Sequence, residues 1–284
     1  MKKLCLLWIL CVALPSWASD EELTADPRVA TALGLLEAWV DAEAAYKDIP
    51  GVSIAVVHDQ TLLWSRGFGF ADRERQARAT PQTMYSICSI SKLFTSIGVL
   101  QLRDRGELQL DDPVAKHLPW FDIQQSYEDA PPVTVRGLLT HSAGLPRETD
   151  HSYWTHPEFE FPTREDVIAQ LSRQSTLYPP GRYFQYSNLS LTLAGEIITQ
   201  LSGMPYDTYV KQHILTPLGL NDTFPELPRE HRGGRFAMGY GGRRREGGRE
   251  TIKFFQARGV APAAGYASTV EDLSKFASWQ FRLL

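Results

Sequence analysis

The sequence has few of the features that mark several common protein classes. It contains three cysteines, two of which (Cys5 and Cys11) lie close to the N-terminus. Three cysteines are too few for a disulfide framework. Acidic residues outnumber basic ones, and the formal net charge of −4 argues against nucleic acid as a partner. The balance of apolar and charged residues excludes a mostly disordered chain, a collagen-like repeat and a polytopic membrane protein.

Several catalytic and cofactor-binding motifs are also absent. No serine stands in a G-x-S-x-G pattern, which argues against the nucleophile elbow of an α/β-hydrolase. The histidines form no H-E-x-x-H zinc motif, and the chain has neither a P-loop nor a G-x-G-x-x-G that opens a helix after a strand. We therefore expect neither a metal nor a cofactor.

The N-terminus has the three-part pattern of a secretory signal peptide. A pair of lysines precedes an apolar run from Leu4 to Leu14, which is too short to cross a bilayer as a helix. Ser16 and Ala18 place small residues at positions −3 and −1 of a cleavage site. The alternative is a buried N-terminal helix. We predict that residues 1–18 are removed and that residues 19–284 are exported to the periplasm or the medium.

The predicted mature chain carries one cysteine, Cys88, and so forms no internal disulfide. No later run of about 18 apolar residues follows, so we expect no membrane span after signal cleavage.

The pattern of apolar residues predicts one hairpin among several helices. Residues 28–48 repeat apolar side chains at helical spacing, and residues 51–70 resemble two strands joined by a turn. Further helices are predicted at 89–105, 135–140, 163–173, 188–201 and 205–215, and after the N-cap residue Thr269.

Residues 229–250 differ in composition from the rest of the chain, with seven arginines and seven glycines. Such segments can bind single-stranded RNA. We favour a solvated surface insertion, because the whole chain is acidic and contains only one such segment.

The first candidate for chemistry is Ser89-Ile90-Ser91-Lys92 at the start of a predicted helix. A serine hydroxyl needs a base beside it to act as a nucleophile. Three residues make nearly one helical turn, so Lys92 faces back toward Ser89. Burial and the positive helix N-terminus would both lower the pKa of the lysine. The alternative is a capping serine with an exposed lysine.

The second candidate is Tyr186-Ser187-Asn188, which also precedes a predicted helix. A phenol can shuttle a proton if its pKa is lowered, and the Asn188 amide can bond both a lysine and a substrate carbonyl. The alternative is a buried aromatic residue followed by an N-cap asparagine.

Cys88 is the neighbour of Ser89 but does not have the i, i+3 spacing to Lys92. We interpret it as a packed small side chain. The alternative is a thiol nucleophile.

Together these motifs resemble the serine β-lactamase and penicillin-binding protein superfamily, in the version found in class C β-lactamases, DD-peptidases of that type and related esterases. Four landmarks occur in the family's order. They are the nucleophile segment 84–92, the stretch 138–146 (similar to "LLTHTSGLP"), the stretch 180–188 (similar to "PG-x-x-F-x-YSN") and the stretch 264–273 (similar to "GGLYSTAEDL").

The resemblance implies an α/β (α+β) fold of the β-lactamase/transpeptidase type, with an antiparallel sheet flanked by helices and an inserted all-helical lobe. The α/β lobe would comprise residues 28–85 and 255–284, and the helical lobe residues 86–254. The site would lie between the lobes.

The resemblance also implies roles for the candidate residues. Ser89 would be acylated, and its backbone N–H would be one oxyanion donor. Lys92 and Tyr186 would take and return the proton, with the identity of the base left open. Asn188 would orient the substrate and Lys92.

The family's third motif, K-T-G or H-x-G on a strand, is not found after residue 273. We therefore expect the sequence to be a C-terminally truncated piece of a longer protein, with an incomplete sheet, and to be inactive by itself.

These observations predict an exported serine hydrolase that acts on an amide or ester, either a small molecule or a peptide, through an acyl-serine intermediate. The alternative is a non-catalytic family member that only binds wall peptides.

Overall fold

The computed structural model describes residues 20–151, 153–154, 159–228 and 235–283. The predicted signal peptide and residues 229–234 of the arginine-rich segment lie outside the described residues. Within these ranges no helix combines the length and apolar character that a bilayer crossing requires.

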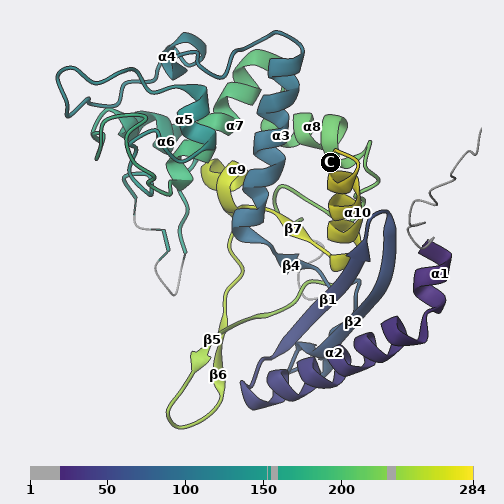
Figure 1. Ribbon diagram of the computed structural model, residues 1–284. Coiled ribbons are helices and arrows are strands. Elements are labelled where there is room, and N and C mark those ends of the chain that lie inside the picture. The colour runs from purple at the N-terminus through teal and green to yellow at the C-terminus, as the bar shows by residue number, and fades with distance from the viewer. Residues whose placement is uncertain (1–19, 152, 155–158, 229–234, 284) are drawn as a thin grey trace, which may run out of the picture.

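A twisted antiparallel sheet forms one side of the molecule (Figure 1). Strands β1 (Gly51–His58), β2 (Thr61–Asp72) and β3 (Ala77–Arg78) pair in that order. The hairpin predicted at residues 51–70 is confirmed, with Asp59 at φ 45° in its turn. Aspartate tolerates this left-handed conformation better than most residues, so Asp59 is well suited to its place in the turn.

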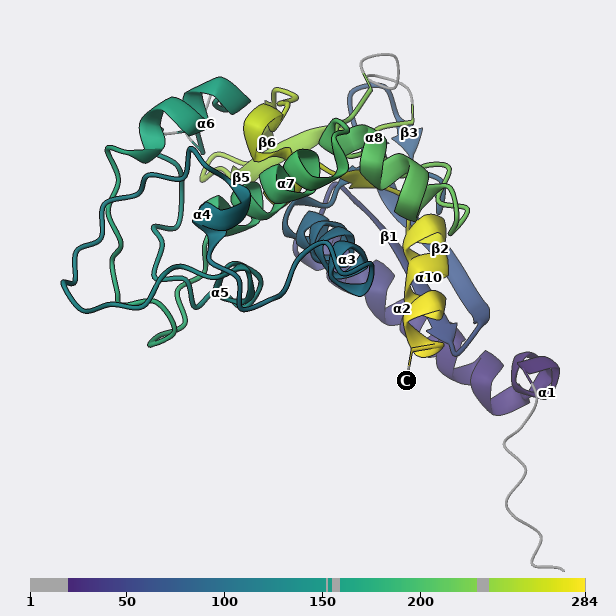
Figure 2. The ribbon, with the colours of Figure 1, turned by 90° about the horizontal axis from the view of Figure 1, so that it is seen from above.

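Two helices pack on this sheet. Helix α2 (Pro27–Tyr46) begins at the N-cap Asp26 and contacts β2, which confirms the helix predicted at 28–48. Helix α10 (Val270–Phe281) contacts β1, and Figure 2 shows it beside the hairpin. The short helix α1 (Asp20–Ala25) precedes α2.

The other side of the molecule is helical. Helix α3 (Ser91–Asp104) follows a 3₁₀ turn, η1 (Cys88–Ile90), and packs against α7 (Asn188–Ser202) and α9 (Ala261–Ala264). The shorter elements here are α4 (Val114–His117), α5 (Val135–Leu139), α6 (Arg164–Leu171), α8 (Tyr206–Val210), the π-helical turn η2 (Lys211–Leu215) and η4 (Arg258–Val260).

Two helix predictions need correction. The helix predicted at 89–105 begins at Ser91, because residues 88–90 form the tighter 3₁₀ turn. The helix predicted at 205–215 is α-helical only to Val210 and continues as a π-helical turn. The helix predicted at 163–173 is confirmed, and Thr163 and Asp166 form a capping box at its start.

One hydrophobic core joins the helices to the C-terminal segment. The fully buried Phe94 of α3 stacks on Tyr266 with ring centroids 4.8 Å apart, and its centroid lies 4.6 Å from that of Phe276 in α10. Close packing of this kind makes a core sensitive to the loss of a single side chain.

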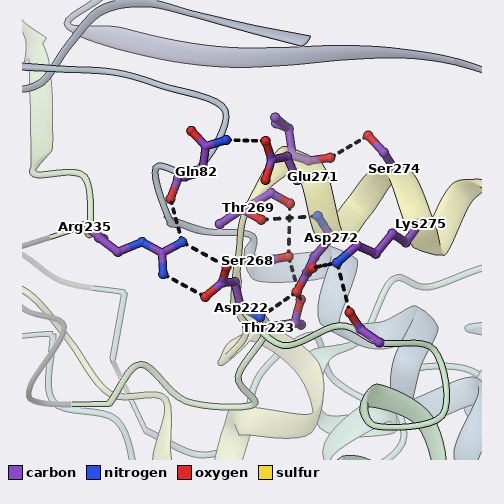
Figure 3. A network of polar contacts seen from close by, with 12 residues as sticks. Gln82, Asp222, Thr223, Arg235, Ser268, Thr269, Glu271, Asp272, Ser274 and Lys275 are labelled. Carbon is purple, nitrogen blue, oxygen red and sulfur yellow. Dashed lines mark hydrogen bonds and ion pairs between the residues drawn. The ribbon is translucent and has the colours of Figure 1, made fainter. Parts of the chain in front are cut away.

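A polar network fixes the start of α10 (Figure 3). The side chain of Thr269 caps the helix by accepting a hydrogen bond from the Asp272 backbone N–H at 3.2 Å. The Asp272 carboxylate is buried and accepts from the Asp222 backbone N–H at 2.7 Å and from Thr223 Oγ1 at 3.0 Å. Lys275 Nζ donates to the same carboxylate at 2.8 Å. A buried carboxylate needs such donors, so the network ties residues 222–223 to α10.

Strand β7 (Ala267–Ser268) connects this network to the nucleophile segment. It pairs antiparallel with β4 (Tyr85–Ser86), which leads directly into η1. The candidate Ser89 therefore follows a strand that the C-terminal segment holds in place.

The described part of the arginine-rich segment is a hairpin of β5 (Gly239–Arg243) and β6 (Arg249–Ile252). Residues 242–248 at its tip are exposed, as predicted for a surface segment. Arg249 anchors the hairpin by donating to the carbonyl oxygens of Asp48 and Lys47 at 2.9 and 3.1 Å.

Candidate active site

Ser89 lies at a constrained point of the backbone. The preceding residue, Cys88, has φ 42°, a left-handed conformation that costs energy for a residue with a side chain. The side chain of Ser91 donates to the Cys88 carbonyl and accepts from the Tyr266 backbone N–H at 3.1 Å. The Ile87 backbone N–H donates to the Tyr266 carbonyl at 2.8 Å. These bonds hold the turn that presents the exposed Ser89 hydroxyl.

Both predicted partners reach the Ser89 hydroxyl. Lys92 Nζ lies 3.1 Å from Ser89 Oγ, and the Tyr186 hydroxyl lies 2.6 Å from the same oxygen. The S-x-x-K spacing therefore gives the predicted contact even though Ser89 precedes the α-helix. The alternative of a capping serine with an exposed lysine is wrong, since Lys92 is 7% exposed.

The Asn188 amide joins Ser89, Lys92 and Tyr186 at the site, as predicted. Its Oδ1 accepts from Lys92 Nζ at 2.7 Å, and the Ala263 carbonyl accepts from the same nitrogen at 2.8 Å. Asn188 is not the N-cap of α7. That role belongs to Ser187, whose hydroxyl accepts from the Ser190 backbone N–H at 2.9 Å.

Burial lowers the pKa of Lys92, because an ammonium group loses hydration inside the protein. The hydrogen bond to Tyr186 and the negative charge of Glu148 act in the opposite direction, and the positive charge of Arg147 adds to the lowering. The Lys92 amine thus has a lowered pKa, three oxygen acceptors and direct contact with a hydroxyl.

An aromatic and cationic shell holds the Tyr186 ring. The His141 ring packs on it with centroids 4.5 Å apart, and Lys92 Nζ and the Arg147 guanidinium lie 4.8 and 5.0 Å from its centroid. His141 Nδ1 accepts from the Ser187 backbone N–H at 3.2 Å. Burial, followed by the charge of Lys92, lowers the pKa of His141. His141 thus accepts a bond from the backbone of Ser187, the N-cap residue of α7.

Backbone bonds join two of the landmark stretches. Leu177 N donates to the Gly144 carbonyl at 2.8 Å, and Gly181 N and Gln185 N donate to the Ser142 and His141 carbonyls at 2.7 Å each. Gly144 has φ 72°, and a Cβ there would lie 2.1 Å from the Tyr178 carbonyl oxygen. Only glycine permits this approach, which brings residues 138–146 against the segment that carries Tyr186.

Glu148 belongs to the site although the sequence did not identify it. Both of its carboxylate oxygens lie 2.9 Å from Asn188 Nδ2. The Tyr153 hydroxyl donates to the same carboxylate, and Arg147 Nε lies 3.2 Å from it. Burial and the bond to this carboxylate raise the pKa of Tyr153. The one available signal was position, since Glu148 stands two residues after the end of the stretch 138–146.

Cys88 is free and half-buried, with Sγ 3.5 Å from Ser86 Oγ. The contact to Lys92 is made by Ser89 instead, as the spacing predicts. In the part of the chain that the structure describes, no group of three His, Cys, Asp or Glu side chains is arranged to hold a metal ion.

The chain matches the model of the Beta-lactamase family over residues 36–284. Among curated proteins it is 31% identical over 176 residues to Protein flp of Staphylococcus aureus strain MW2, an alignment that covers 62% of this chain and 34% of the relative. The chain thus spans about a third of the length of that relative.

Two solved structures extend the likeness to the fold. The octameric penicillin-binding protein homologue from Pyrococcus abyssi aligns with a TM-score of 0.74 and 32% identity, covering 87% of this chain and 55% of the other. The class C beta lactamase from Rhodobacter sphaeroides aligns with a TM-score of 0.68 and 27% identity, covering 84% and 63%. The predicted β-lactamase/transpeptidase-like α/β fold, with antiparallel sheets and helices, is confirmed. The chain belongs to the beta-lactamase family.

Proposed function

We propose that this protein is a serine hydrolase that cleaves an amide or ester bond through an acyl-enzyme on Ser89. The observation that supports it most directly is the convergence of Lys92 Nζ and the Tyr186 hydroxyl on Ser89 Oγ, at 3.1 and 2.6 Å. A serine hydroxyl becomes a useful nucleophile when a neighbouring group takes its proton, and both groups are close enough to do so.

In the proposed reaction, Ser89 Oγ attacks the carbonyl carbon of the substrate. The hydroxyl proton passes to Lys92 or Tyr186 and returns to the leaving amine or alcohol as its bond to the carbonyl carbon breaks. Water then attacks the acyl-serine in the same way, which releases the acid and restores the hydroxyl. The Ser89 backbone N–H is one donor to the developing oxyanion, and Asn188 orients Lys92 and the substrate.

The substrate is a small molecule or peptide that contains a β-lactam, D-peptide or ester bond, since this acylation step is common to all three. We further propose that the protein is exported, on the strength of the signal-peptide pattern at residues 1–18.

The test is covalent labelling of the full-length protein with a fluorescent penicillin and with a fluorophosphonate. We expect at least one reagent to add a single equivalent, seen as a mass increase of the intact protein. Ser89→Ala should abolish the label. Ser172→Ala, which changes an exposed serine at the end of α6, should keep it. Labelling by neither reagent would favour a non-catalytic member that only binds wall peptides.

A further inference from the structure

We propose that Glu148 is a positioning residue of the site. It orients the Asn188 amide so that the amide oxygen faces Lys92, and its negative charge helps to retain the positive charge on Lys92. This role rests on the proposed function of Ser89, because Glu148 acts on Ser89 only through Asn188 and Lys92.

The contacts of the Asn188 amide allow one orientation. Its nitrogen lies 2.9 Å from both oxygens of Glu148, and its oxygen lies 2.7 Å from Lys92 Nζ. A carboxylate only accepts hydrogen bonds, and a lysine ammonium only donates them. Turning the amide around would place its oxygen against the carboxylate and its NH₂ group against the ammonium. Glu148 therefore determines which end of the amide faces Lys92.

Glu148 is itself held in place. The buried Tyr153 donates its hydroxyl to the carboxylate, and Gln174 Nε2 donates to the Glu148 carbonyl at 2.9 Å. The Glu148 side chain is 23% exposed and contacts Arg147 Nε at 3.2 Å. A carboxylate with this many donors has few alternative rotamers, so it can impose an orientation on its neighbour.

The charge of Glu148 matters because Lys92 is buried. The groups that influence the Lys92 amine are Tyr186, Glu148 and Arg147, and Lys92 in turn acts on His141. Burial disfavours the ammonium form, whereas a nearby carboxylate favours it. Glutamine at position 148 could still accept a bond from Asn188 but would lack the charge. Alanine at position 148 would lack the charge and would also leave the Asn188 NH₂ group without this acceptor. Asn188 is only 3% exposed.

A double-mutant cycle tests whether Glu148 acts through Asn188. The measured quantity is the rate constant for labelling of Ser89 by a fluorophosphonate, followed by intact mass. We expect Glu148→Ala to lower it about ten- to hundredfold in the wild type, the range for a lost bond to a charged group. In the Asn188→Ala background the same change should lower the rate constant by a much smaller factor, because only the effect of the Glu148 charge on Lys92 remains. Glu107→Gln, an exposed site beyond the far end of α3, should change neither rate.

A second measurement does not depend on turnover. The Lys92 amine is titrated by NMR in protein with ¹³Cε-labelled lysine, and its signal is assigned with Lys92→Met. Loss of the neighbouring negative charge in Glu148→Gln should move the Lys92 midpoint to lower pH, while Glu107→Gln should leave it unchanged. A purely structural role of Glu148 would not move this midpoint in a folded variant.

Additive rate effects in the cycle, or a Lys92 midpoint that Glu148→Gln does not move, would overturn the proposal. If the wild-type protein takes up no label at all, the proposed function fails. The Lys92 titration then still decides whether Glu148 positions Asn188 and Lys92.

Discussion

The groups around Ser89 have separate physical tasks. The backbone of Cys88 adopts a left-handed conformation just before the exposed Ser89, while Lys92 Nζ and the Tyr186 hydroxyl both lie within hydrogen-bond distance of Ser89 Oγ. Strained backbone of this kind persists only where surrounding contacts determine it. The bonds from Ser91 to Cys88 and Tyr266 provide those contacts.

Tyr186→Phe isolates the hydroxyl that lies 2.6 Å from Ser89 Oγ. We expect the rate constant for labelling of Ser89 by a fluorophosphonate to fall by about 10²- to 10⁴-fold, the usual contribution of a positioned acid or base. The ring contacts with His141 should survive, so the variant should remain folded. Tyr183→Phe, at a side chain with an exposed ring, should label at the wild-type rate. Equal rates for wild type and Tyr186→Phe would contradict the role of the phenol.

Among the secondary-structure elements, α6 and α7 are joined by a partly buried ion pair. Arg164 Nε donates to both carboxylate oxygens of Glu196, at 3.0 and 2.8 Å, and the Glu196 side chain is 10% exposed. Burial raises the pKa of Glu196, and the bond to Arg164 opposes this without cancelling it. The pair thus retains a desolvation cost.

This raised pKa predicts a pH dependence of stability. A carboxyl group whose pKa is higher in the folded state than in the unfolded state stabilises the fold fully at pH values below its unfolded pKa. The contribution is lost as the pH rises above 4.5 and through the folded value. Wild type should therefore lose stability between pH 4 and 7 relative to Glu196→Gln, which cannot titrate.

The measurement is urea unfolding at pH 4 and pH 7, with Glu128→Gln as an exposed control that should follow wild type. If the free energies of unfolding of wild type and Glu196→Gln differ by the same amount at pH 4 and at pH 7, the pKa of Glu196 is not raised in the folded state.

At the level of the whole molecule, the core joins the helical side to the C-terminal helix. Phe94 of α3 contacts Tyr266 and Phe276, which precede and follow Thr269, the N-cap of α10, in the sequence. A core shared in this way predicts one cooperative unfolding transition.

Phe94→Ala should lower the free energy of unfolding by about 3–5 kcal/mol, the cost of removing a buried phenylalanine ring. Leu93→Ala, at a neighbouring side chain that is 51% exposed, should cost less than about 1 kcal/mol. Urea unfolding is followed by far-ultraviolet circular dichroism and by tryptophan fluorescence. Two separate transitions, with Phe94→Ala affecting only one, would contradict a shared core.

Local sequence patterns predicted an element well where the spacing of its apolar residues, or a turn or cap residue at its end, was enough to specify it. The hairpin at 51–70, the helix at 28–48 and the capping box at Thr163 are examples. The start of α3 was displaced by two residues because the turn at 88–90 depends on bonds to Tyr266, which is distant in the sequence. The π-helical turn at 211–215 has no signal that apolar spacing alone reveals.

By itself, the sequence identified Ser89, Lys92, Tyr186 and Asn188 as candidate site residues, because they stand in two short motifs, S-x-x-K and Y-S-N, beside predicted helix starts. Only the tertiary structure decided that the two motifs meet at one hydroxyl, and that Glu148 stands behind Asn188. That meeting depends on the close approach of Gly144 to Tyr178 and on the packing of α3 against α7. These contacts join residues far apart in the chain, and no local periodicity records them.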